Sequence, residues 1–194
     1  MSLVGKPAPD FTATAALNQE EKEIQLSDYK GKLILFFFYP FDFTYVCPTE
    51  IRAFSDKLDE FKKRGVEVIG CSVDSVHSHK AWLRTPREKG GIEHVAYPIV
   101  ADITKSIARD YGVLMEDKGY ALRGSFLIDK DFIVRMEQVY DGPLGRSVEE
   151  TLRVIDAWIF FEKNGEVCPA DWHPGDEAMA TSAAGITNFF GKKH

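Results

Sequence analysis

Hydrophobic residues in this chain gather into short runs that alternate with segments of helical periodicity. Residues 33–39 are apolar throughout and predict a buried strand over 32–39. Apolar residues spaced three and four apart come next, at Ile51, Phe54, Leu58 and Phe61. This spacing predicts a helix near 47–63, which Gly65 is expected to end.

The same alternation continues to the middle of the 160s. The further expected elements are strands at 66–73, 97–100, 124–129 and 132–139, and helices that start near Ser75, Thr104 and Ser147. Asn164 and Gly165 are expected to end the last helix. Strands that alternate with helices favour an α/β sandwich with a mixed central sheet, and this is the predicted fold class.

Composition narrows the picture to an ordinary globular protein. The 194 residues suit one domain, and the 44% that are hydrophobic can form a substantial core. The net charge of −6 argues against a nucleic-acid-binding surface. No apolar run approaches the roughly 20 residues of a membrane span. Residues 1–10 lack the apolar stretch of a secretion signal, so a cytoplasmic location is expected.

The most informative residue is Cys47, which follows the predicted strand over 32–39 and begins the predicted helix. Unpaired backbone N–H groups and the positive end of the helix dipole meet at such a position. This setting favours the thiolate over the thiol, and the thiolate is the nucleophile. Most lone cysteines are inert core residues. The placement of Cys47, together with the neighbouring Thr44 and the flanking Pro40 and Pro48, predicts a reactive one instead.

Arg123 enters a predicted core strand, where an unpaired charge is very costly. Two interpretations stay open: Arg123 forms a structural ion pair with Glu50 or another acid, or it faces the Cys47 sulfur and supports the substrate. Thr44 is expected to cap the helix, to hydrogen-bond at the sulfur, or to do both. Pro40 restricts the backbone and shields the thiolate from bulky molecules.

The residues around Cys47 limit the chemistry that it can perform. An acyl-transfer enzyme would place a histidine base nearby, whereas the five histidines are expected to be solvated: His77, His79, His94, His173 and His194. A dithiol oxidoreductase would carry a cysteine where Glu50 stands, and the three cysteines lack paired metal-ligand spacing. What remains is attack of the thiolate on a weak O–O bond, which leaves a sulfenic acid and needs no metal, haem or flavin.

A sulfenic acid on Cys47 needs a second thiol to resolve it. Cys168 lies behind the last long helix, in a segment expected to be flexible and exposed, and it is the natural candidate. Condensation of the two cysteines would form a disulfide. Cys71 falls within the predicted strand over 66–73 and is expected to be a buried, unreactive residue.

The segments around the two candidate cysteines resemble a known family. Residues 43–50 (FTYVCPTE) and 165–170 (GEVCPA) are similar to the signatures of typical two-cysteine peroxiredoxins, which include the bacterial alkyl hydroperoxide reductase C proteins. The resemblance runs from about Gly5 to Gly175. It implies a thioredoxin-like fold, with a peroxidase domain over residues 1–165 and a C-terminal arm over residues 166–194.

The resemblance also implies roles for single residues. Cys47 would be the peroxidatic cysteine and Cys168 the resolving cysteine, which attacks Cys47 of the partner subunit. A homodimer is then the functional minimum, and family members often assemble dimers into a decameric ring. The residues that the motif carries into the peroxide site are Pro40, Thr44 and Arg123, with Glu50 paired to a nearby arginine.

The implied activity is reduction of hydrogen peroxide and organic hydroperoxides. The sequence leaves the electron donor open between thioredoxin, a flavoprotein and other dithiol proteins. Two further hypotheses from other classes remain: a holdase or signalling assembly that does not depend on turnover, and a general disulfide oxidoreductase. The missing Cys-x-x-Cys motif counts against the last of these.

Overall fold

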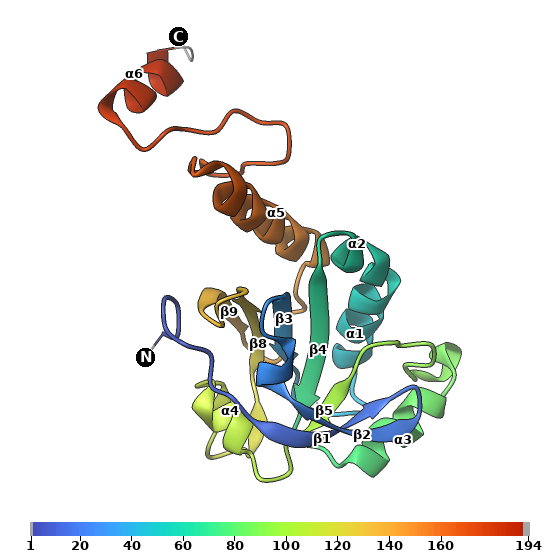
Figure 1. Ribbon diagram of the computed structural model, residues 1–194. Helices are drawn as coiled ribbons and strands as arrows, with labels where there is room; N and C mark the ends of the chain where they lie inside the picture. Colours follow the sequence, from blue (N-terminus) through green and yellow to red (C-terminus); the bar gives the residue numbers. More distant parts are fainter. Residues whose placement is uncertain (1, 192–194) are drawn as a thin grey trace. The chain divides into compact units, whose positions relative to one another are not determined.

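The computed structural model describes residues 2–191 and contains two compact units, which divide between Arg146 and Ser147. Each unit is described by itself (Figure 1). This grouping places the last long helix in the same unit as the tail. The expected division into domains 1–165 and 166–194 is a different statement, and it stays a prediction. Within residues 2–191, no helix combines the length and apolar content needed to cross a bilayer.

The first unit contains the whole central sheet. Its strands are β1 (Thr12–Leu17), β2 (Glu20–Gln25), β3 (Leu33–Phe38), β4 (Val66–Ser72), β5 (Ile99–Ala101), β6 (Leu114–Met115), β7 (Tyr120–Ala121), β8 (Arg123–Ile128) and β9 (Val134–Tyr140). Its helices are η1 (Leu26–Tyr29), α1 (Cys47–Asp56), α2 (Leu58–Lys63), α3 (Val76–Arg84), η2 (Arg87–Lys89) and α4 (Ser106–Asp110).

In the described part of the chain, seven strands form one sheet in the order β2-β1-β5-β4-β3-β8-β9, and β6 and β7 form a separate hairpin. Strand β3 pairs in parallel with β4 and antiparallel with β8. The sheet is therefore mixed, and the predicted α/β class with a mixed central sheet is confirmed.

Strand β3 is apolar throughout because both faces of the sheet are covered there. Phe36 and Phe38 point to one face, where their rings contact Tyr111 at centroid distances of 5.0 and 5.4 Å. Phe37 points to the other face and stacks on Phe54 of α1 at 4.7 Å. This alternation fixes α1 against the sheet, and Cys47 is the first residue of α1.

The predicted helix over 47–63 is in fact two helices. Helix α1 ends at Asp56, α2 begins at Leu58, and Lys57 between them has φ −102° and ψ 9°. The apolar spacing continues across the break, because Leu58 and Phe61 are still buried. The periodicity therefore predicted the buried face correctly and missed the interruption.

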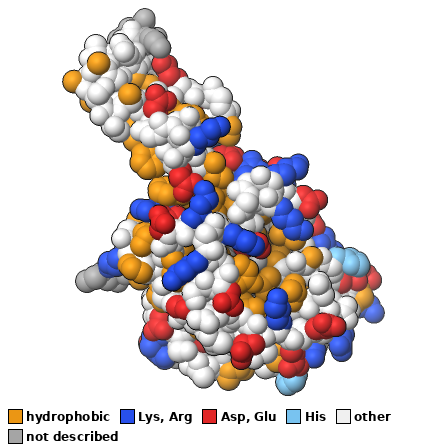
Figure 2. All heavy atoms as spheres, in the orientation of Figure 1, with side chains coloured by type: hydrophobic (Ala, Val, Ile, Leu, Met, Phe, Trp, Pro, Cys, Tyr) orange, Lys and Arg blue, Asp and Glu red, His pale blue; other side chains and the backbone are white. Residues whose placement is uncertain are grey.

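Charged side chains cover much of the surface of the first unit. On the face that Figure 2 shows, Lys and Arg side chains alternate with Asp and Glu side chains, and neither sign forms a large continuous patch. Several of these charges are paired, as in Lys32 with Glu67 at 2.6 Å and Arg109 with Glu116 at 2.7 Å. The visible face therefore offers no broad basic surface of the kind that binds nucleic acid.

The second unit begins with α5 (Val148–Asn164) and also contains α6 (Ala183–Gly191). The Ser147 hydroxyl accepts the Glu150 N–H at 3.2 Å, which is half of a capping box. The Glu150 carboxylate binds Arg153 at 2.6 and 2.7 Å rather than reaching back to Ser147. Gly165 ends α5 with φ 69°, as predicted.

The tail folds against α5 within the second unit. Arg153 donates to the Trp172 carbonyl at 3.1 Å, and the rings of Phe160 and Trp172 lie 4.8 Å apart. A bridge joins Val167 to Met179. These contacts explain why α5 belongs to the same compact unit as the tail.

Candidate active site

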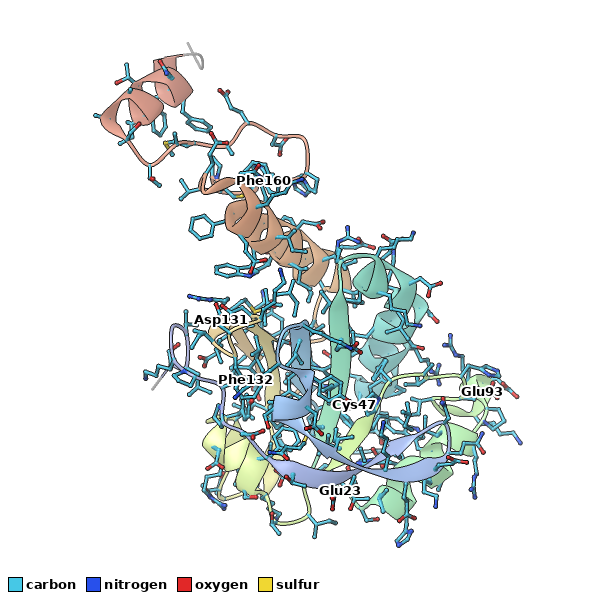
Figure 3. All side chains as sticks on the ribbon, in the orientation of Figure 1. Glu23, Cys47, Glu93, Asp131, Phe132 and Phe160 are labelled. Atoms are coloured by element: carbon cyan, nitrogen blue, oxygen red, sulfur yellow. The ribbon has the colours of Figure 1, made fainter. Side chains whose placement is uncertain are left out.

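Cys47 lies at the junction between a core strand and a helix. The chain leaves β3 at Phe38, passes through the loop over residues 40–46, and enters α1 at Cys47 (Figure 3). Pro48 occupies the first turn, where a missing N–H costs nothing. The side chain of Cys47 is fully buried, so its sulfur meets protein groups rather than solvent.

The guanidinium of Arg123 contacts the sulfur directly. Its Nη1 donates to Cys47 Sγ at 3.3 Å and to a Glu50 carboxylate oxygen at 2.7 Å, while its Nε donates to the Gly142 carbonyl at 2.8 Å. Arg123 is the first residue of β8 and is itself buried. The structure thus combines the two placements that the sequence left open for Arg123: it is an ion pair of Glu50 and a neighbour of the sulfur.

The Glu50 carboxylate binds two arginines, one of which contacts the Cys47 sulfur. It lies three residues after Cys47, on the same side of α1. Its other partner is Arg146, whose backbone N and Nε donate to one carboxylate oxygen at 2.8 Å each and whose Nη2 donates to the other at 3.0 Å. Arg146 also donates to the Gly124 carbonyl at 2.7 Å and so ties the end of the first unit to β8.

This network contains one carboxylate and two guanidinium groups, so it carries one positive charge in excess although all three side chains are buried. Burial by itself raises the pKa of the Glu50 carboxyl. The hydrogen bonds and charge of Arg146, with the charge of Arg123, outweigh burial and hold this pKa below its ordinary value. An arginine near Glu50 was expected from the sequence, but Arg146 was not identified, because it lies 96 residues away in the chain.

Thr44 takes neither role that the sequence suggested for it. Its hydroxyl donates to the Phe41 carbonyl at 3.0 Å, and the residue that caps α1 is Val46, without a side-chain hydrogen bond. Thr44 thus closes the turn before the helix. Pro40 is buried just after the end of β3, and its expected part in shaping the loop stays a prediction.

A buried polar cluster holds the loop that carries Thr44, and it was not predicted from the sequence. Asp42 accepts hydrogen bonds from the Tyr39 hydroxyl and the Ser78 hydroxyl at 2.7 Å each, and lies 2.8 Å from His79 Nδ1. His79 is fully buried, so the expectation that it is solvated was wrong. The signal was present: the apolar Trp82 is three positions after His79, which puts both on one helix face.

The other two cysteines have different surroundings. Cys71 is fully buried in β4, where burial and then the charge of Asp102 raise the pKa of its thiol well above the ordinary value. Cys168 is half-buried rather than exposed, and its Sγ lies 3.6 Å from the Ala157 carbonyl of α5. Burial raises the pKa of Cys168, and the charge of Arg153 partly opposes this.

Together these features fit nucleophilic attack by one sulfur. Cys47 begins a helix and has a guanidinium donor beside its sulfur, which can stabilise a developing oxyanion. Among the described residues, no group of three or more histidine, cysteine or carboxylate side chains is placed to hold a metal.

The fold and the site define a thiol peroxidase, an enzyme of thioredoxin-like architecture that reduces peroxides with a cysteine. Residues 4–137 match the model of the AhpC/TSA family, and residues 157–192 match the C-terminal domain of 1-Cys peroxiredoxin. The chain belongs to the AhpC/TSA family and is a peroxiredoxin.

Relatives of known name support the assignment over nearly the full length. The chain is 52% identical to Peroxiredoxin-1 of Gallus gallus over 99% of this chain and 97% of the relative. It is 50% identical to Thioredoxin peroxidase of Echinococcus granulosus over 97% of each chain. The reduced 2-Cys peroxiredoxin of Plasmodium vivax superimposes with a TM-score of 0.96, at 45% identity, over 98% of this chain and 100% of that one.

Proposed function

We propose that Cys47 reduces hydrogen peroxide and organic hydroperoxides, and that Cys168 then resolves the oxidised sulfur as a disulfide. The observation that carries the proposal is the 3.3 Å contact between Arg123 Nη1 and Cys47 Sγ at the start of α1. It places a permanent cation beside the one cysteine that also lies at a helix N-terminus, in the described part of the chain.

In the first step, the Cys47 thiolate attacks one oxygen of the peroxide. The S–O bond forms as the O–O bond breaks, sulfur loses two electrons, and the leaving oxygen departs as alkoxide or hydroxide. This anion takes up a proton to give an alcohol or water. Arg123, whose guanidinium lies at the sulfur, stabilises its charge as it develops.

The surrounding residues position these groups. Glu50 and Arg146 hold the Arg123 guanidinium at the sulfur through the buried ion pairs. The bond from Thr44 to the Phe41 carbonyl orients the Thr44 oxygen, whose lone pairs remain able to accept a proton donor such as the peroxide O–H. Pro40 restricts the loop on the strand side.

In the second step, the Cys168 sulfur attacks the Cys47 sulfenic acid, and water leaves as the disulfide forms. We propose that the two cysteines come from different subunits, so the working enzyme is a homodimer, with a decameric ring of such dimers as the larger assembly. Self-association of a relative supports this: Plasmodium yoelii Prx1a, when modified at its N-terminus, forms an octamer that is described as artifactual.

A dithiol protein then reduces the disulfide. Thioredoxin is the donor that we favour over a flavoprotein, because the Echinococcus granulosus relative is named Thioredoxin peroxidase. The expected cytoplasmic location, where thioredoxin keeps thiols reduced, is part of the same proposal.

Non-reducing gel electrophoresis after one equivalent of peroxide tests the scheme. Wild type should give a covalent dimer that disappears in both Cys47→Ser and Cys168→Ser. A dimer that persists in Cys168→Ser would refute resolution by Cys168. A disulfide that forms within the monomer would refute the intersubunit pairing but not the peroxidase chemistry.

A further inference from the structure

Two aromatic rings pack against each other outside the core, in segments next to those that carry Thr44 and Arg123. The rings of Phe41 and Tyr120 lie 5.4 Å apart, tilted by 58°. Phe41 is 36% exposed and Tyr120 is half-buried, so this pair of rings forms part of the surface. An aromatic pair that stays partly exposed has apolar area left for another molecule.

The two rings come from the two segments that build the peroxide site. Phe41 directly follows Pro40, and its carbonyl accepts the Thr44 hydroxyl at 3.0 Å. Tyr120 belongs to β7, three residues before Arg123, whose guanidinium contacts the Cys47 sulfur. The ring pair therefore joins the Thr44 side of the site to the Arg123 side.

The backbone on both sides of the pair is fixed. Asp42, the residue after Phe41, is buried and bound by Tyr39, Ser78 and His79. Ala121, the residue after Tyr120, is buried and paired with Leu114. Side chains held by such anchors are preorganised, so a ligand that packs on them loses little free energy in ordering them.

We propose that the Phe41–Tyr120 ring pair is the specificity wall for the organic group of a hydroperoxide; this rests on the function proposed above. The O–O bond must reach a buried sulfur, while any organic group must extend outward from it. Between the segment of Thr44 and the segment of Arg123, that group meets the two rings. Hydrogen peroxide has no organic group and gains no binding free energy from the two rings, so the wall favours bulky apolar hydroperoxides.

A second ring pair in the same loop provides a matched comparison. Phe43 is 55% exposed, and its ring lies 5.6 Å from that of Trp82 in α3. It is the same side chain two residues further along, yet it faces α3 rather than the strand segment that carries Arg123. Phe43→Ala therefore removes an exposed ring from the loop without removing the wall.

The test measures kcat/KM for cumene hydroperoxide and for hydrogen peroxide in wild type and in four variants. In Phe41→Ala and Tyr120→Ala, the ratio of the two values should fall about fivefold to tenfold, because a partly buried ring contributes that much in an apolar site. Tyr120→Phe keeps the ring and should keep the ratio. Phe43→Ala should also keep the ratio.

Each other outcome overturns the inference in a distinguishable way. An unchanged ratio in Phe41→Ala and Tyr120→Ala shows that the rings do not contact the organic group. An equal fall in Phe43→Ala shows a general loosening of the loop, and an equal fall in Tyr120→Phe assigns the effect to the hydroxyl. A wild type that turns over neither peroxide contradicts the peroxidase chemistry of Cys47 itself. Turnover of hydrogen peroxide alone leaves that chemistry standing, but contradicts both the wall and the proposed reduction of organic hydroperoxides.

Discussion

Cys47 and Cys168 differ in what surrounds their sulfur atoms. The Cys47 sulfur is fully buried, yet it receives a hydrogen bond from a guanidinium that two further ionised groups hold in place. The Cys168 sulfur is half-buried and lies against a carbonyl oxygen, the Ala157 carbonyl, toward which only a protonated thiol can donate.

The difference shows that burial alone does not decide the reactivity of a cysteine. Burial raises the pKa of both Cys168 and Cys71. At Cys47 the protein instead places a guanidinium within hydrogen-bond distance of the buried sulfur, at the first residue of a helix. The three cysteines thus differ in the charged groups beside their sulfur atoms.

The largest expected effect is the loss of turnover when either cysteine is replaced. Cys47→Ser should consume no peroxide, because it lacks the nucleophile. Cys168→Ser should consume about one equivalent per subunit and then stop as the sulfenic acid, since no resolving thiol is present. Stopped-flow peroxide consumption, with trapping of the sulfenic acid by dimedone, distinguishes them. Sustained turnover by Cys168→Ser with thioredoxin would contradict the division of roles.

Replacing Arg123 should remove the guanidinium that distinguishes the surroundings of Cys47 from those of Cys168. In Arg123→Met, kcat/KM for hydrogen peroxide should fall about 10²- to 10³-fold, because a preorganised donor to the reacting atoms is lost. Arg123→Lys should fall less, since it keeps the charge but not the fork of donors. A normal rate in Arg123→Met would show that the helix N-terminus alone suffices.

Removing the Glu50 carboxylate, and with it the ion pairs to the two arginines, should lower the free energy of unfolding by an amount that depends on pH. Glu50→Gln leaves two buried arginines without their carboxylate and should cost about 3–5 kcal/mol. Because folding lowers the pKa of Glu50, its contribution is present above the unfolded-state pKa and is lost as pH falls through the folded-state pKa.

Urea unfolding of wild type and Glu50→Gln from about pH 7 down to about pH 3 measures this contribution. The difference in free energy of unfolding between the two proteins should narrow as the pH falls, because Glu50 of the wild type then becomes protonated. A gap that stays constant across this range would show that the carboxylate charge does not stabilise the fold.

The smallest expected effect is on the alkylation rate of Cys168 when the neighbouring Arg153 is replaced. The charge of Arg153 opposes the rise in the pKa of Cys168 that burial causes. Arg153→Met should therefore raise this pKa further and slow alkylation of Cys168 at neutral pH about twofold to threefold, in a Cys47→Ser background. Lys163→Met, at the exposed end of α5, is the matched control and should leave the rate unchanged. An unchanged rate in Arg153→Met would show that Arg153 does not influence the Cys168 thiol.

Local patterns predicted those features that depend on neighbouring residues. These features are the apolar run of β3, the apolar spacing of α1 and α2, and the end of α5 at Gly165. Each depends only on residues that are a few positions apart in the chain. The break at Lys57 did not follow from such patterns, because the apolar spacing continues across it. Neither did the role of Thr44, whose hydroxyl had several possible acceptors within the same turn.

Sequence alone determined that a cysteine starts a helix directly after a core strand, since the strand period, the helix period and the prolines are all local. Only the tertiary structure decided which groups surround that cysteine. Arg123 and Arg146 reach Cys47 and Glu50 from 76 and 96 residues away. The physical reason is that buried charges must be satisfied by partners in space, and sheet pairing rather than chain proximity brings those partners together.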